Sequence, residues 1–399
     1  MVFGLTSQRG RWLFIPLGII VLLCAGTVYS WSIFRKPLED LLGISATESV
    51  LPFTVCLIVS TLLMPIAGFF TDKYGVRIVT AIGGFLIGLS YILSGLAKDI
   101  PTLVITYGII GGAGIGIASV GPVAVSAQWF PDKKGLAIGL TGTGFGLSPL
   151  VTAPWARYLI ESYGVPQTFM YLGTALAVII MAISIVLKMP PSYWITSQTA
   201  VEKNASLEAN NNLAPMLRSL KFYGLWLCYL IGSFLGISAI SISSPFAQEI
   251  LNIELKTSAI TVSVFAVFNA IGRILFGWLT EEINTQKAAI ISYILMLIGS
   301  LLMISADEGD ALTYLVGFSL FWFSFGGWLA IAGTATMIWF GSKNYAKNYG
   351  IIFTAYGLGA LLGPLAASHL RDTLGNYICT FYLNAALATV GIIIAVFML

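Results

Sequence analysis

Long apolar runs dominate this sequence and limit the folds open to it. A helix needs roughly 20 apolar residues to cross the hydrocarbon core of a bilayer, which is about 30 Å thick. Twelve runs satisfy this length, near residues 12–34, 50–71, 78–97, 102–128, 135–158, 167–188, 222–247, 257–280, 287–305, 311–339, 348–370 and 377–399. We therefore predict an all-α, polytopic membrane protein with twelve transmembrane helices in the lipid bilayer.

The composition excludes several other classes of protein. Only 9% of the residues are charged and 57% are hydrophobic, whereas about a quarter of the residues of a soluble domain are charged. Disordered chains, coiled coils and nucleic-acid-binding proteins also need more charge. The four cysteines form no CxxC pair, and the sequence has no metal-ligand cluster and no nucleophile elbow. We expect no metal, no cofactor, no nucleic-acid partner and no enzymatic activity.

One polar stretch, residues 189–221, separates the sixth apolar run from the seventh. It predicts a cytoplasmic linker between an N-terminal six-helix half, residues 1–188, and a C-terminal half, residues 222–399. Cytoplasmic termini place thirteen of the twenty Lys and Arg residues in inner loops and six, including Arg35, in outer loops. Because basic residues favour the inner side, we expect a multi-pass protein of the cell membrane, inner or plasma, with both termini cytoplasmic. We also expect a monomer.

The two halves resemble each other in sequence. The segment Gly68-Phe-Phe-Thr-Asp72-Lys73 ends the second run, and Gly277-Trp-Leu-Thr-Glu281-Glu282 ends the eighth, 209 residues later. Trp129-Phe130 ends the fourth run and Trp339-Phe340 the tenth, 210 residues later. Such an offset predicts two parallel six-helix repeats about an axis along the membrane normal, which is typical of transporters.

The loop after the second run carries the pattern Gly68-x-x-x-Asp72-Lys73-x-Gly75-x-Arg77, which resembles the signature of the major facilitator superfamily. Its glycines permit a tight turn and close helix approach. Its charges can pair with neighbouring helix ends. We therefore predict a gating role for this loop and for its counterpart in the second half, with the gating residues Gly68, Asp72, Lys73, Gly75, Arg77 and Glu281.

Three further segments resemble one branch of that superfamily. They are Tyr29-Ser-Trp-Ser32 with Pro37-Leu38, the segment from Gly112-Ala-Gly-Ile-Gly116 to Trp129-Phe-Pro-Asp-Lys-Lys-Gly-Leu-Ala137, and Asn348-Tyr-Gly350. Together they are similar to the oxalate/formate antiporter family, whose members carry small carboxylates. The resemblance implies the major facilitator fold and a small carboxylate anion as the substrate.

The resemblance also implies a set of cavity residues. Oxalate transporters of that family have an arginine in the eighth helix, which matches Arg273, and a lysine in the eleventh, where this chain has Tyr356. One aromatic position in the fourth helix falls near Ser119, which is not aromatic. The other aromatic cavity positions fall on Tyr29, Phe325, Trp328 and Phe353, and we add Asn269, four residues before the arginine, as a substrate-binding candidate.

Arg273 is the strongest candidate from the residues themselves. It precedes Glu281 by eight residues, which places it about 12 Å inside the membrane from the helix end. A cation at this depth must face protein or water, and all 17 acids can be assigned to loops or helix ends. One alternative is an arginine that snorkels to the interface or bonds to backbone carbonyls. The other is an arginine that binds a substrate carboxylate through two parallel hydrogen bonds.

Charge counting selects among the possible substrates. One buried cation neutralises one monocarboxylate, whereas a dianion leaves surplus charge in a medium of low dielectric constant. Tyr356 can donate a hydrogen bond but supplies no second charge. We therefore predict a secondary active transporter of a monocarboxylate such as formate, acetate, lactate or pyruvate, working by alternating access, with exchange favoured over proton symport. Two alternatives remain: an oxalate or other dicarboxylate/formate antiporter, and a non-transporting membrane sensor on a transporter scaffold.

Overall fold

The computed structural model describes residues 10–130, 134–191, 214–306, 309–340 and 345–399. Eleven helices among these residues are long and apolar enough to cross a membrane. The longest, at 50 residues, spans Ala137–Val186 and is broken at Gly164, where φ is 79°. A helix of that length would extend about 75 Å, more than twice the bilayer core, so it makes two crossings. The prediction of twelve transmembrane helices is therefore confirmed.

The elements form two groups along the chain. The first group is η1 (Arg11–Leu13), α2 (Phe14–Ala25), η2 (Gly26–Ser30), α3 (Trp31–Leu42), α4 (Ala46–Tyr74), α5 (Val76–Ser94), α6 (Ile100–Leu103), the π-helical η3 (Val104–Gly111), α7 (Gly112–Trp129) and α8 (Lys134–Val186). The second group is α10 (Ala214–Leu217), α11 (Leu220–Glu249), α12 (Leu255–Ile283), α13 (Thr285–Ile304), α14 (Ala311–Phe340), α15 (Tyr345–Leu374) and α16 (Ile378–Met398).

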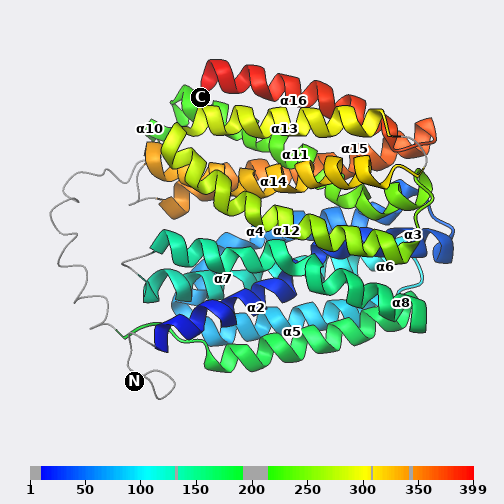
Figure 1. Cartoon of the computed structure of the whole chain (residues 1–399). Coiled ribbons are helices and arrows are strands. Elements are labelled where there is room, and N and C mark those ends of the chain that lie inside the picture. The colour runs from blue at the N-terminus through cyan, green and yellow to red at the C-terminus, as the bar shows by residue number, and fades with distance from the viewer. Residues whose placement is uncertain (1–9, 131–133, 192–213, 307–308, 341–344) are drawn as a thin grey trace.

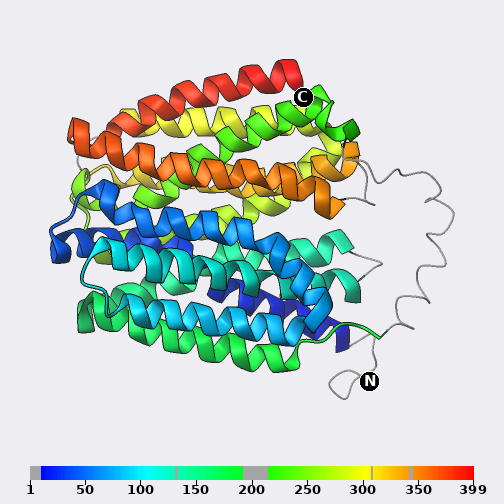
Figure 2. The same ribbon diagram turned by 180° about the vertical axis from the view of Figure 1, so that it is seen from behind.

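The long helices of both groups run roughly side by side, with the first group below the second in Figure 1. The contacts between the groups are made by α8 with α12, α4 with α15 and α3 with α11. The start of α2 and the end of α16 lie at one end of the bundle, here named the terminal end, and α3 ends at the opposite, far end (Figures 1 and 2). Residues 192–213 lie outside the described residues, so the division of the chain at residues 189–221 stays a prediction.

The backbone repeats where the sequence does not. Left-handed φ values recur in three pairs separated by 209, 209 and 211 residues: Gly43 (64°) with Asn252 (54°), Gly75 (87°) with Asn284 (92°), and Gly164 (79°) with Gly375 (82°). Glycine adopts this region freely and asparagine is the side-chain-bearing residue that tolerates it best. The two groups therefore make the same turns between their helices, as expected for two parallel repeats.

The Trp-Phe pairs of the two repeats anchor the segments that enter each group. The guanidinium of Arg11 lies 4.6 Å from the ring centroid of Phe130, and the ammonium of Lys221 lies 5.2 Å from that of Trp339. Trp129 donates its indole N–H to the Lys188 carbonyl at 2.8 Å. These contacts give the repeated aromatic pairs a structural role at the terminal end.

The far end contains a buried base that the sequence analysis assigned to an outer loop. Arg35 is 0% exposed and lies within α3, so that assignment was wrong. Its Nη2 is 3.6 Å from Oε1 of Glu39, which is 6% exposed, and also donates to the Ala46 carbonyl at 2.8 Å. Its Nε donates to Ser49 Oγ at 3.0 Å. The hydropathy of the sequence did not place Arg35 and Glu39 in the interior, because the second half of α3 is polar on one face and ends beside a loop.

Several hydrogen bonds at the far end join the two groups of helices. Arg35 donates from Nη1 to the Ser241 carbonyl at 3.0 Å and from Nη2 to Ser368 Oγ at 3.1 Å. Asp372 of α15 accepts from the backbone N–H groups of Ala46 and Thr47, at 3.1 and 2.8 Å, at the start of α4. A carboxylate is favoured at a helix N-terminus. Charge-assisted bonds therefore hold the groups together at this end.

Replacing Arg35 with Met should destabilise the protein strongly, since removing one partner of a buried ion pair costs about 3–5 kcal/mol. The measurement is the melting temperature of the purified protein in detergent, where we expect a fall of several degrees. Lys36→Met is the matched control, because the ion pair of Lys36 with Asp40 is exposed, with side-chain exposures of 32% and 64%, and such pairs contribute about 0–1 kcal/mol. Equal melting temperatures for the two variants would contradict the structural role of Arg35.

Candidate functional site

Arg273 of α12 lies half-buried between the two groups of helices. Its Nε donates to Oδ1 of Asn269 at 3.2 Å, and its Nη1 donates to the carbonyl of Gly142 in α8 at 3.1 Å. The ion pairs found between described residues involve Arg35, Lys36, Arg157 and Arg371, and none includes Arg273. In the described part of the chain, this guanidinium has neutral acceptors but no carboxylate as a counter-ion.

A break in the first membrane-crossing segment places a tyrosine beside this arginine. Tyr29 lies in η2, a stretch of 3₁₀ helix between α2 and α3, and such mid-helix stretches often mark functional positions. Gly26 allows the close approach to α8, because a Cβ there would lie 2.5 Å from the Phe145 carbonyl oxygen. The Tyr29 hydroxyl is 3.3 Å from the Tyr356 hydroxyl and interacts with Arg273. Residues from η2, α12 and α15 therefore meet at one point.

Aromatic rings line this meeting point. Tyr29 packs edge-on against Phe325, with ring centroids 6.0 Å apart, and Phe325 stacks with Tyr356 at 6.2 Å. Phe353 stacks with Tyr356 at 4.8 Å and an interplanar angle of 12°. The structure thus brings four of the predicted aromatic residues together, and two of them, Tyr29 and Tyr356, interact with Arg273.

Two other predicted cavity residues lie apart from this cluster. Trp328 is fully buried and packs one layer further into the second group, against Tyr229 at 6.3 Å and Tyr293 at 5.1 Å. Ser119 donates its hydroxyl to the Ile115 carbonyl of its own helix at 2.7 Å, and none of the described contacts joins it to Arg273. Substrate contacts by these two residues stay predictions.

Several neighbours of the cluster were not predicted from the sequence. Phe145 packs against Tyr29 with centroids 5.1 Å apart, and Tyr229 lies 6.4 Å from Tyr356. Gly142 and Gly146 face Arg273 and Asn269 from α8. The sequence contains a signal for this part of α8, because Gly144-Phe-Gly-Leu-Ser-Pro149 resembles Gly359-Ala-Leu-Leu-Gly-Pro364 in the second half. Tyr229 has no sequence signal that separates it from the other buried aromatic residues.

The predicted gating loop lies at the terminal end, between α4 and α5. Asp72 and Lys73 are exposed, and Gly75 makes the turn with a φ of 87°. Arg77 donates from Nε to the Leu187 carbonyl at 2.9 Å, just beyond α8 in the same group. Nothing lies within 4 Å of the place where a Cβ on Gly68 would be, and the ion pairs among the described residues do not include Asp72. A latch made by this loop stays a prediction.

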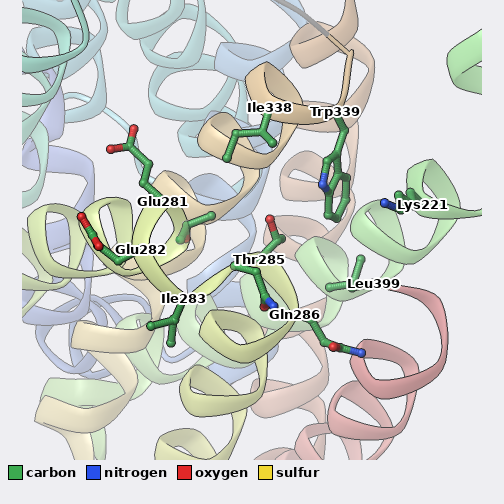
Figure 3. Close-up of a pocket in the computed structure, with 11 residues that line it drawn as sticks. Lys221, Glu281, Glu282, Ile283, Thr285, Gln286, Ile338, Trp339 and Leu399 are labelled. Carbon is green, nitrogen blue, oxygen red and sulfur yellow. The ribbon is translucent and has the colours of Figure 1, made fainter.

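Glu281, the counterpart of Asp72, lines a pocket of about 450 Å³ at the terminal end of the second group. Figure 3 shows Lys221 beside Trp339 on one side of this pocket and Glu281 on the other. The lining residues are Lys221, Thr280, Glu281, Glu282, Ile283, Asn284, Thr285, Gln286, Ile338, Trp339 and Leu399, so the pocket is separate from the Arg273 cluster. Among the described residues, no group of three or more His, Cys, Asp or Glu could hold a metal ion.

Comparisons with known proteins agree with this architecture. A family model described as Major Facilitator Superfamily matches residues 17–338. The oxalate:formate antiporter of Oxalobacter formigenes is 26% identical over 391 residues, which cover 98% of this chain and 91% of that protein. Monocarboxylate transporter 12-B of Danio rerio is 24% identical over 348 residues, 81% of this chain and 73% of that one.

Solved structures show the same fold. The crystal structure of a D-xylose-proton symporter superposes with a TM-score of 0.74 at 16% identity, over 97% of this chain and 96% of that one. The family model covers far more than half of the sequence, and the repeats, the helix count and the signature loop agree with it. The chain belongs to the major facilitator superfamily.

Proposed function

We propose that this secondary transporter, which is not an enzyme, carries a small monocarboxylate such as formate, acetate, lactate or pyruvate. The observation that carries the proposal is the guanidinium of Arg273, which lies between the two groups of helices with no carboxylate partner among the described residues. The hydroxyls of Tyr29 and Tyr356 adjoin it. A guanidinium binds a carboxylate through two parallel hydrogen bonds, and the two hydroxyls can donate to the same anion.

The charge balance of the site favours one negative charge on the substrate. Arg35, the fully buried base at the far end, already has Glu39 as its partner, so it offers no free charge to a ligand. Tyr356 stands where oxalate transporters of the resembling family have a lysine. A dianion at Arg273 would therefore retain one uncompensated charge in a poorly hydrated site, which is energetically unfavourable.

The mechanism follows from the placement of the site between the groups. The two halves rock about the anion bound to Arg273, while the aromatic rings of Tyr29, Phe325, Phe353 and Tyr356 form the walls. The gating charges, including Asp72 and Glu281, close the terminal end, which we place in the cytoplasm together with both termini. An anion that binds the occluded state more tightly than the open states accelerates the switch. This requirement favours anion exchange over proton symport. We also propose that the carrier works as a monomer.

Arg273→Ala should reduce carboxylate uptake about 30-fold or more, because truncating one partner of a desolvated charge pair costs about 2–5 kcal/mol. Uptake by Arg273→Lys should lie between that of Arg273→Ala and that of the wild type, since lysine restores the positive charge but lacks the planar pair of N–H donors. The measurement is uptake of labelled formate or lactate into proteoliposomes preloaded with the same anion.

Arg157→Ala is the matched control, because Arg157 pairs with Glu161 at 4.0 Å and makes no described contact with the site. Normal transport by Arg273→Ala would refute the site. Binding of carboxylates by the wild type without any uptake would support the sensor alternative.

Tyr356→Lys should shift the preference toward dicarboxylates. The variant places a second cation beside Arg273, so we expect the ratio of oxalate to formate uptake to rise about tenfold, equivalent to about 1.4 kcal/mol. Tyr356→Phe is the control, because it removes the hydroxyl and adds no charge. A wild type that prefers oxalate, or an unchanged ratio in Tyr356→Lys, would contradict the charge argument.

Asn269→Asp should supply an internal counter-ion. The Oδ1 of residue 269 is 3.2 Å from Nε of Arg273, so a carboxylate there would neutralise the guanidinium and compete with the substrate. We expect the KM for formate to rise about fivefold or more, because the attraction between two charges this close is about 1 kcal/mol even in bulk water and larger in a less hydrated site. Asn384→Asp changes another fully buried amide, which donates to Ser238 Oγ at 3.4 Å, and should leave KM within twofold of the wild type.

A further inference from the structure

The Nε edge of Arg273 is held by a neighbour that is itself fixed. Asn269 accepts from Nε through Oδ1 at 3.2 Å and donates through Nδ2 to the Trp322 carbonyl at 3.0 Å. Its side chain is 0% exposed. Because both ends of the amide are committed to protein groups, the amide has one orientation, and that orientation presents an acceptor to Arg273.

The helix that carries Arg273 is also fixed in place. A Cβ on Gly272 would overlap the Phe323 carbonyl of α14, and a Cβ on Gly326 would overlap the Asn269 carbonyl of α12. These two glycines let the backbones of α12 and α14 touch, as small residues do at membrane helix interfaces. The arginine therefore projects from a rigid pair of helices.

The opposite side of the guanidinium is covered by α8 of the first group. A Cβ on Gly146 would lie 2.5 Å from Asn269 Oδ1, 3.2 Å from Arg273 Nε and 3.5 Å from Arg273 Cζ. One turn away, the Gly142 carbonyl accepts from Nη1 at 3.1 Å. The backbone of α8 thus lies against the side chain, and only glycine fits at position 146 without displacing Asn269 or Arg273.

We propose that Gly146 is a positioning residue of the anion site, acting through Arg273. A guanidinium has five N–H donors in one plane, and a carboxylate needs two adjacent donors to bind in parallel. Because Nε is held between Asn269 and Gly146 and one N–H of Nη1 donates to the Gly142 carbonyl, the remaining N–H groups of Nη1 and Nη2 are the ones that meet the anion. This inference rests on the proposed function. It explains why the pair of guanidinium N–H groups that binds the carboxylate points in a defined direction.

Position 139 on the same helix provides the comparison. Gly139 precedes Gly146 by seven residues, or two turns, and lies on the same face of α8. Nothing lies within 4 Å of the place where its Cβ would be. Replacing either glycine with alanine therefore changes the helix propensity equally, but only the alanine at position 146 contacts Arg273.

The experiment measures formate uptake into proteoliposomes as KM and maximal rate, for Gly146→Ala and Gly139→Ala in the wild-type and Arg273→Lys backgrounds. We expect Gly146→Ala to raise KM about tenfold with less than a threefold change in maximal rate, and Gly139→Ala to change neither by more than twofold. In the Arg273→Lys background, which has no guanidinium to orient, Gly146→Ala should change KM less than twofold. Such non-additivity identifies an effect that acts through Arg273.

Two outcomes would overturn the inference: an unchanged KM in Gly146→Ala, or an equal rise in both backgrounds, as loosened packing would give. If Gly146→Ala does not fold, Asn269→Ala tests the same contact from the other side and should also raise KM about tenfold. The double variant Asn269→Ala/Gly146→Ala should fold, because the Oδ1 atom that the new Cβ would meet is gone. Failure of the proposed function is a separate result, since it requires normal uptake by Arg273→Ala.

Discussion

The electrostatic cost of placing arginine in an apolar interior shapes the two most important clusters of this protein. Arg35 offsets the cost through Glu39, which neutralises its charge, and through four neutral oxygens that accept hydrogen bonds from its N–H groups. Arg273 offsets it only in part, through neutral groups: the Asn269 amide oxygen, the Gly142 carbonyl oxygen and the Tyr29 hydroxyl. Neutral acceptors satisfy the N–H donors of a guanidinium but do not neutralise its positive charge. The first arginine is thus a structural element, and the second retains an attraction for an anion.

Glycine determines where the helices come close enough to share these bonds. At Gly26 the backbone of η2 lies directly against the backbone of α8, and at Gly146 the backbone of α8 lies directly against the side chains of Asn269 and Arg273. In a bilayer such contacts replace the hydrophobic drive that packs soluble helices. The shape of the site is therefore set by backbones, while its chemistry comes from a few polar side chains.

The sequence predicts the fold well because hydropathy, basic residues and repeat offsets are additive signals spread over hundreds of residues. It also predicts Arg273, since one deep base stands out against an apolar run. It does not predict Arg35, because a base near a helix end has the same hydropathy whether it faces the loop or another helix. It does not predict Gly146 as a contact of Arg273 either, since that contact depends on how α8 and α12 approach each other. The roles of Asn252 and Asn284 were not predicted for a related reason. Each adopts a left-handed φ at a turn, and the match with the corresponding glycine of the first half becomes visible only in the structure.

The far-end cluster is built so that opening it need not break its ion pair. Arg35 and Glu39 both belong to α3, four residues apart, and would stay together if the groups separated. The bonds that would break are those from Arg35 to Ser241 and Ser368, and those from Asp372 to the start of α4. Each is a bond between a charged and a neutral group, worth about 1.5–3 kcal/mol net, and water that enters the opened end replaces part of it. A substrate shifts a conformational equilibrium only by its differential affinity for the states. Keeping the ion pair within one helix lowers the free energy that anion binding at Arg273 must supply to open the far end.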